Sequence, residues 1–207
     1  MEQIKEYEYV DLGLPSGLKW ANMNLGATSE TDYGDYYMWG STKPNTADEC
    51  NWTNAPFTNG DSNYDEEYFT SHKSEWLDDK DNLKSEYDAA YKATNGMARL
   101  PTKDDFQELL ENTEDEWIIN FNGTGVNGRK FTSKTDTSKY IFFPASGYRS
   151  ESEIRVRGKY GYYCISTINS LMPENYYGFN FNSTLVQNDD CYRYYGCCVR
   201  PVRNLPL

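Results

Sequence analysis

The sequence contains a single histidine, His72, among its 207 residues. Metal centres built from several histidines are therefore excluded. A Ser-His-Asp or Cys-His catalytic arrangement would depend on this one residue, which lies in a polar stretch. We therefore interpret His72 as a solvated side chain, and we expect no enzymatic activity, no metal and no cofactor.

Long apolar runs are missing as well. No stretch approaches the length needed to span a bilayer, so we expect no membrane insertion. The first residues, MEQIKEYEYVDLG, lack the basic segment followed by an apolar segment that is typical of a secretory leader. Export by another route, a leader that has been removed, and a place inside the cell or in a virion all remain open.

Basic residues are few relative to acidic ones. Twenty Lys and Arg stand against thirty-two Asp and Glu, which gives a net charge of −12. Such a field repels phosphate backbones, so binding to nucleic acid is not expected.

The five cysteines form no recognisable framework. Their number is odd, and the spacing of Cys191, Cys197 and Cys198 matches neither a zinc site nor a secreted disulfide pattern. A bridge between adjacent Cys197 and Cys198 would be strained. We expect free thiols at positions that tolerate many residue types.

What the sequence has in quantity is aromatic rings. Hydrophobic residues make up 38% and aromatic residues 16%, which predicts a core built from rings more than from Leu and Ile. The length suits a single domain over 1–207. Within it, 41–80 is polar and predicts an ordered but irregular insertion, fastened to the core by scattered aromatic residues: Trp52, Phe57, Tyr64, Tyr68, Phe69 and Trp76.

Two segments have helical spacing. Leu83, Tyr87, Ala90 and Tyr91 predict a helix over 82–94, and the stretch RLPTKDDFQELLEN, with Thr102 as its cap, predicts a second over 102–113.

Several stretches have the character of strands. Alternating runs at 7–12 and 18–24, joined by a Pro-Ser-Gly turn, predict a hairpin, and 35–39, 140–144 and the region 117–121 predict further strands. A charged loop is expected after Gly147. The stretch GTGVNG at 123–128 matches a dinucleotide-binding pattern, but no helical pattern follows it, so we interpret Asn127-Gly128 as a hairpin turn.

The tail, 160–203, has an unusual composition. It holds eight of the nineteen tyrosines, five asparagines and four cysteines, with neither lysine nor tryptophan. Tyr and Asn supply contact area and adaptable hydrogen bonds, as in binding surfaces. Strand-like pieces at 161–167, 176–181 and 199–203 alternate with expected loops at 168–175 and 184–193, and the alternation should leave Asn180 and Asn182 exposed opposite Tyr177, Phe179 and Phe181.

Five motifs in order carry a family resemblance: YVDLGLPSGLKWA, DYGDYYMWG, ARLPTKDDFQELL, FPASGYR and RYYG..VRPVR. The chain resembles the Bacteroidetes and Fibrobacter major paralogous domain family and, more distantly, the formylglycine-generating-enzyme fold. The resemblance implies one α+β domain of C-type lectin fold, with two helices packed on twisted antiparallel strands, long ordered loops and adjacent chain ends.

The chain departs from this family in its tail. Family members usually carry a tryptophan where this chain has Cys164, and an aromatic residue and a serine where it has Cys197 and Cys198. Losing a buried tryptophan is costly, so we expect these positions to lie outside the core.

This pattern resembles the variable proteins of diversity-generating retroelements, in which adenines of AAY codons are rewritten. The resemblance implies a variable region over 160–203, with Met172, Glu174 and Gln187 fixed because such codons do not reach them. The residues expected to form the variable ligand-binding face share reachable types or an aromatic ring: Tyr162, Cys164, Ile165, Asn169, Ser170, Leu171, Asn175, Tyr177, Asn180, Asn182, Asp189, Asp190, Cys191, Tyr192, Tyr194 and Cys197.

The expected function is binding of a protein or glycoconjugate ligand on another cell or virus, by a protein displayed on a cell surface or virion. Three alternatives remain. One is an adhesin of the same fold with fixed specificity. Another is a calcium-dependent lectin using 173–175 and 188–190, which stand in the wrong order for such a site. The third is a copper-dependent enzyme using Cys191 and Cys197.

Overall fold

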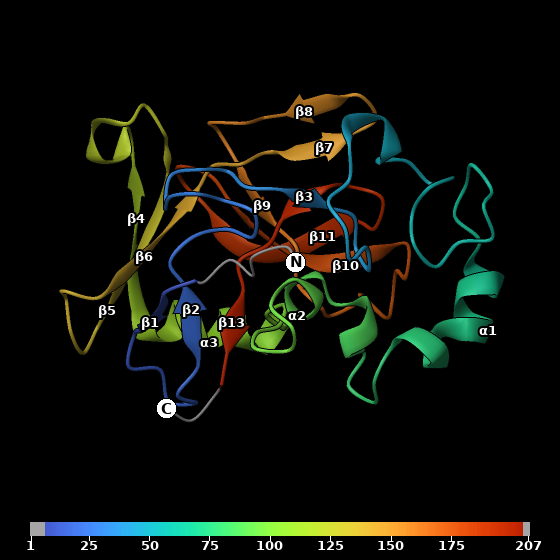
Figure 1. Ribbon diagram of the computed structural model, residues 1–207, viewed down its shortest axis with the longest axis horizontal. Coiled ribbons are helices and arrows are strands. Elements are labelled where there is room, and N and C mark those ends of the chain that lie inside the picture. The colour runs from blue at the N-terminus through green and yellow to red at the C-terminus, as the bar shows by residue number, and fades with distance from the viewer. Residues whose placement is uncertain (1–6, 205–207) are drawn as a thin grey trace.

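The computed structural model describes residues 7–204 and has a mixed α+β architecture in which strands predominate (Figure 1). Twisted, mostly antiparallel sheets carry three α-helices. The α+β expectation is confirmed at this level. The helices are α1 (Glu66–Trp76), α2 (Ala89–Ala93) and α3 (Lys103–Asn112), with short 3₁₀ turns η1 (Ala47–Glu49), η2 (Ser85–Tyr87) and η3 (Phe121–Gly123).

The largest sheet has five strands in the order β11-β10-β9-β12-β3. All neighbours are antiparallel except β12 and β9, and four of the five strands come from the tail. The tail therefore supplies most of the largest sheet. The bounds are β3 (Tyr36–Tyr37), β9 (Gly161–Tyr163), β10 (Asn175–Phe181), β11 (Val186–Tyr192) and β12 (Cys197–Cys198).

A second sheet joins the two ends of the described chain. Its order is β1-β2-β13, with β1 (Tyr9–Asp11) and β13 (Val202–Arg203) on either side of β2 (Lys19–Ala21). Trp20 of β2 stands opposite both Val10 and Val202. The expected N-terminal hairpin is confirmed, and the first and last strands of the described residues lie within one sheet.

The third sheet is a meander of β4 (Thr113–Ile118), β5 (Gly128–Ser133) and β6 (Tyr140–Pro144). The strand expected over 140–144 is confirmed. The tight turn expected at Asn127-Gly128 is wrong, because Gly128 is already in β5 opposite Ile118 and the connection is the longer loop 119–127. The expected charged loop after Gly147 is also wrong in part, since β7 (Tyr148–Ser150) and β8 (Glu153–Arg155) form a hairpin there.

Helix α3 begins where the sequence predicts. The Thr102 hydroxyl accepts from the Asp105 N–H while the Asp105 carboxylate accepts from the Thr102 N–H, which forms a capping box. Phe106 and Leu109 are its buried residues. The helix expected over 82–94 is broken in two, because Asp88 has extended backbone angles between η2 and α2.

Helix α1 lies inside the stretch expected to be irregular. Its mean composition is polar, so its apolar face is not evident from periodicity; the face consists of Phe69 and Trp76, both buried. The expectation that aromatic residues fasten this segment is confirmed. Phe57 stacks on Trp76 with ring centroids 4.7 Å apart, and Asp65 caps the helix by accepting from the Tyr68 N–H.

Rings dominate the core, as the composition predicts. Phe106 of α3 stacks on Phe179 of β10 with centroids 3.8 Å apart, and Phe143 of β6 contacts both Trp20 and Tyr163. These contacts join the main sheet and both three-stranded sheets to α3 in one hydrophobic core.

Candidate binding face

The tail contains five strands where its composition predicts three, and β11 and β12 are the two that were not expected. The stretch 184–193, expected to be a loop, is mostly strand β11, which pairs along its whole length with β10. It is an edge strand of the main sheet. Only Cys191 of this strand is buried, so the sequence lacks the alternation of apolar and polar residues by which a strand is predicted.

The cysteine expectation is wrong in its placement of the side chains. All five cysteines are free, but all five are buried. Cys164, Cys197 and Cys198, expected to lie outside the core, are fully within it, and so is Ile165. These four positions therefore pack the interior, where each thiol behaves as a small apolar side chain.

Three of the asparagines are buried as well. Asn169 donates to the Asp190 carboxylate (2.6 Å) and accepts from the N–H groups of Leu171 and Met172, so it holds the loop 168–175 in place. Asn175 is buried, and Asn180, expected to be exposed, is 9% exposed. The side-chain oxygen of Asn182 accepts from 184–185 and closes the turn between β10 and β11.

Seven of the sixteen expected face residues are thus inside the molecule: Cys164, Ile165, Asn169, Asn175, Asn180, Cys191 and Cys197. The other nine reach the surface. Ser170, Leu171, Asp189, Asp190 and Tyr192 are exposed, and Tyr162, Tyr177, Asn182 and Tyr194 are half-buried. Leu171 is the most prominent, with 90% of its surface exposed.

Strand pairing separates these surface residues. Tyr177 stands opposite Asp190 and lies under the Lys103 ammonium of α3 (3.7 Å to the ring centroid). Tyr162 stands opposite Asn180, which belongs to the alternate set of β10 side chains. Because alternate side chains point to opposite faces of a sheet, the sixteen residues do not form one continuous surface.

What the fold does bring together is a group of rings, which we call the tyrosine cluster: Trp52, Tyr148, Tyr160, Tyr162, Tyr192, Tyr194 and Tyr195. Tyr148 stacks on Tyr195 at 4.3 Å and contacts Tyr162 at 4.8 Å. Tyr192 stacks on Tyr194 at 5.6 Å, and Trp52 contacts Tyr194 at 5.0 Å. All seven rings are exposed or half-buried, so the cluster forms a surface.

The cluster is assembled from distant segments. Trp52 belongs to the insertion, Tyr148 to β7 and the remaining tyrosines to the tail. Figure 1 shows β7 lying beside the main sheet, where β7 meets the tail through paired bonds between Arg149 and Gly196. Of these seven residues, the sequence prediction included only Tyr162, Tyr192 and Tyr194. Tyr160 and Tyr195 lie in the same tyrosine-rich tail and could have been added on that ground. Trp52 and Tyr148 lie outside the tail, and only the fold shows that they belong to the cluster.

Arg193 is buried and contacts Trp52, one of the rings of the tyrosine cluster. Its side chain is fully buried, with the guanidinium 4.2 Å from the ring centroid of Phe69 and 5.5 Å from that of Trp52. Nη1 donates to the Pro56 carbonyl (3.3 Å), whereas Nε and Nη2 have no hydrogen-bond partner within residues 7–204. Burial lowers the pKa of Arg193 to about 10, against an opposing effect of Tyr64 and Glu174.

Burial affects the hydroxyls of two cluster tyrosines, Tyr162 and Tyr195. Burial raises the pKa of Tyr162 to about 12, and burial also raises the pKa of Tyr195, which nearby Tyr194 and Tyr148 raise further. The hydroxyls of Tyr162 and Tyr195 are therefore neutral donors and acceptors at neutral pH.

His72 lies on α1, away from the tail in sequence. Its Nδ1 is 2.8 Å from the Tyr68 carbonyl oxygen and 3.0 Å from the Ser71 hydroxyl, and its ring stacks near Trp76. It is half-buried and packs against Tyr68 and Trp76, whereas a solvated side chain was expected. Across residues 7–204, no group of three or more His, Cys, Asp or Glu is arranged to hold a metal ion. Nor does the described part of the chain include a helix with the length and apolar character to cross a membrane.

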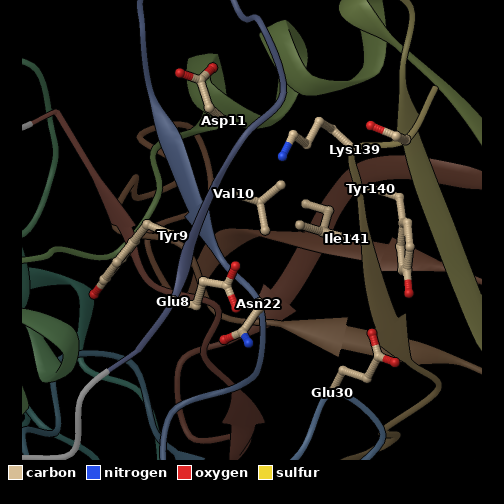
Figure 2. A pocket seen from close by; sticks show the side chains of 10 residues that line it. Glu8, Tyr9, Val10, Asp11, Asn22, Glu30, Lys139, Tyr140 and Ile141 are labelled. Atoms are coloured by element: carbon tan, nitrogen blue, oxygen red, sulfur yellow. The ribbon is translucent and has the colours of Figure 1, made fainter. Parts of the chain in front are cut away.

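A separate pocket of about 370 Å³ lies between β1 and β6. Figure 2 shows Val10 and Ile141 close together in it, with Lys139 to one side and Glu30 toward the Tyr140 end. Burial raises the pKa of Glu30, opposed by Arg200 and Asn122. The lining mixes acidic, basic and apolar groups and contains none of the sixteen expected residues, so this pocket is distinct from the tyrosine cluster.

Comparison with known proteins adds no relative: no protein-family model, no curated protein and no solved structure matches this chain.

Proposed function

We propose that this chain is a non-enzymatic ligand-binding protein that uses the tyrosine cluster as its binding surface. The observation that carries the proposal is the gathering of seven exposed or half-buried rings from three separate regions of the chain at one place. Tyrosine offers a large contact area and loses little side-chain entropy on binding, so such a group is suited to recognition.

The support beneath the cluster favours the same function. Tyr162 and Tyr192 are in strands, and 193–196 is tied to β7 and to the segment after β3 by main-chain bonds, including one from the Trp39 N–H to the Arg193 carbonyl (3.1 Å). A surface held by strands and braced loops can bind without a large ordering cost.

The fold that we propose is of the C-type lectin type. Three features support it: the order of the five sequence motifs, the sheet that pairs the N-terminal and C-terminal strands, and α3 packed on the main sheet through Phe106 and Phe179. The ligand proposed for it is a protein or glycoconjugate on another cell or virus, met by a protein displayed on a cell surface or virion.

We further propose that a diversity-generating retroelement varies this tail, but only at the nine surface positions named above. Replacing a fully buried Cys164 or Ile165 by Asp or Asn would place an unpaired polar group in the core, which costs about 1 to 3 kcal/mol or more for each group. Ser170, Leu171 and Asp189 meet no such limit, because they are exposed.

Sequencing of the DNA that flanks this gene tests the proposal. We expect a near-copy of the segment encoding 160–203 beside a reverse transcriptase gene, with mismatches at adenines and concentrated in the codons of the nine surface residues. Without such a copy the protein would instead be an adhesin of fixed specificity. If the mismatches fell mainly in codons of the seven buried residues, the restriction to the surface would be wrong.

A further inference from the structure

Two buried thiols, those of Cys191 and Cys197, are in contact at the two ends of the segment 192–196, which carries three of the cluster tyrosines. The sulfur atoms of Cys191 and Cys197 are 3.7 Å apart. Cys191 is at the end of the edge strand β11 and Cys197 is in the inner strand β12, and these strands are not neighbours in the sheet. Between the two cysteines lie Tyr192, Tyr194 and Tyr195.

We propose that Cys191 and Cys197 form a reversible disulfide that fastens the segment 192–196, which carries three residues of the tyrosine cluster. The bond itself is independent of any ligand. Its consequence for recognition rests on the proposed function, since it would fix the part of the binding surface that contributes three of the seven rings.

The chemistry is thiol–disulfide exchange with a small-molecule disulfide such as oxidised glutathione. The Cys191 thiolate attacks one sulfur of the oxidant, forming a mixed disulfide and releasing one glutathione thiolate, which takes up a proton. The Cys197 thiolate then attacks the Cys191 sulfur and displaces the second glutathione. Two cysteine thiols are oxidised and one glutathione disulfide is reduced to two thiols.

The geometry needs only a modest change. A disulfide has a sulfur–sulfur bond of about 2.0 Å, so the two atoms must approach by less than the width of one atom. Cys191 is the better entry point because β11 is an edge strand with a partner on one side only. Edge elements open more readily than central ones, which admits the oxidant.

The other thiols nearby are held differently. The Cys198 thiol lies 3.1 Å from the Tyr33 carbonyl oxygen, and Cys164 has its sulfur directed to the Ile165 carbonyl (3.8 Å). Because Cys198 follows Cys197 in the same strand, their side chains point to opposite faces. Cys198 is therefore a matched control for the pair.

The disulfide would also restrain the segment between the two cysteines. Its ends are already positioned, since the Arg193 N–H donates to the Glu174 carbonyl and the Tyr195 N–H to the Tyr192 carbonyl. A covalent link across such a short loop removes freedom mainly from the unfolded chain. We expect the melting temperature to rise by roughly 4 to 8 °C on oxidation.

The test is a count of thiols in the full chain before and after incubation with oxidised glutathione. After an acid quench and denaturation, N-ethylmaleimide should label five cysteines in the reduced protein and three in the oxidised protein. The oxidised chain should be lighter by about 2 Da before labelling, and peptide mapping should join the peptides of Cys191 and Cys197.

Variants make the result specific. Cys198→Ala should start with four reactive thiols and lose two on oxidation, whereas Cys191→Ala should start with four and retain all four. The same treatment in strong denaturant should give mixed pairings and so shows that the oxidant is active. Five labelled thiols after native oxidation, a stable glutathione adduct, or a link involving Cys50, Cys164 or Cys198 would each overturn the proposal. Because the count needs no ligand, it stands or fails separately from ligand binding.

Discussion

Two buried arginines lie within eight positions of each other and are held in opposite ways. Arg200 donates from Nε to the Asn24 side-chain oxygen (2.9 Å), from Nη1 to the Ala21 carbonyl (3.1 Å) and from Nη2 to the Phe142 carbonyl (2.8 Å). Arg193 is surrounded by rings and makes one long bond. Neither guanidinium forms an ion pair with a carboxylate among residues 7–204. Hydrogen bonding therefore defines the role of Arg200, and packing defines that of Arg193.

The same substitution should separate these roles. Arg200→Met leaves three buried acceptors unpaired and should lower the free energy of unfolding by at least about 3 kcal/mol. Arg193→Met keeps most of the contact with the rings and removes a buried charge, so it should cost less than about 1.5 kcal/mol. Urea denaturation of both variants gives the comparison, with Arg155→Met on the surface as a control near zero. Equal losses for the two buried positions would contradict it.

Asp88 is the buried carboxylate between η2 and α2. It accepts from the Tyr91 N–H (2.9 Å) and from the Leu100 N–H (2.8 Å), so it caps α2 and ties it to the segment before α3. Burial raises the pKa of Asp88 from 3.8 to about 6, although these bonds and Arg99 act in the opposite direction. The desolvation of the charged form outweighs the hydrogen bonds.

This shift predicts a pH dependence. Because the pKa of Asp88 is higher in the folded state, the folded state binds the proton more tightly, and this contribution to stability is present below pH 4 and is lost as the pH rises through about 6. The free energy of unfolding of the parent minus that of Asp88→Asn should fall by roughly 2 to 3 kcal/mol between pH 4 and 6.5. Denaturation of both proteins across this range measures the difference. A difference that rises with pH would mean that the hydrogen bonds keep the pKa low.

At the level of elements, the three glycines of the stretch GTGVNG, between β4 and β5, have different structural roles. Gly123 and Gly125 have positive φ angles of 75° and 79° and open space around them. Gly128 begins β5, where a side-chain carbon would overlap the Phe143 carbonyl oxygen of β6. The first two permit the loop, and the third permits the sheet to pack.

Alanine substitutions should distinguish these roles. Gly128→Ala forces β5 and β6 apart and should lower the free energy of unfolding by at least about 3 kcal/mol. Gly125→Ala meets only the unfavourable left-handed backbone and should cost about 1 kcal/mol. Thermal or urea unfolding of each variant provides the values. A Gly128→Ala protein as stable as Gly125→Ala would show that the sheet can absorb the extra carbon.

Local signals predict some elements well and miss others. Thr102 and the stripe of Phe106 and Leu109 locate α3 because the cap and the apolar face are both local. Helix α1 has no such stripe in its polar composition; two rings that pack on distant parts of the chain stabilise it. Strand β11 is missed for the same reason, since its pairing with β10 makes it a strand.

At the level of the whole molecule, the tail has two roles. Its inward side chains complete the core, and its outward rings meet Trp52 and Tyr148 to form the tyrosine cluster. A region of the chain that supplies four strands of the main sheet can change only where its side chains leave that core. This division is the reason that the proposed variation is confined to nine surface residues.

The sequence by itself determined the α+β class, the ring-built core, the N-terminal hairpin, the strand 140–144 and the cap of α3, because these depend on composition and on neighbours a few residues apart. Only the tertiary structure decided that the five cysteines are buried and that seven of the sixteen expected face residues point inward. It also decided which tyrosines meet. Burial and ring contacts depend on strand pairing between distant segments. The types of the residues in a strand do not determine which distant strand it will pair with.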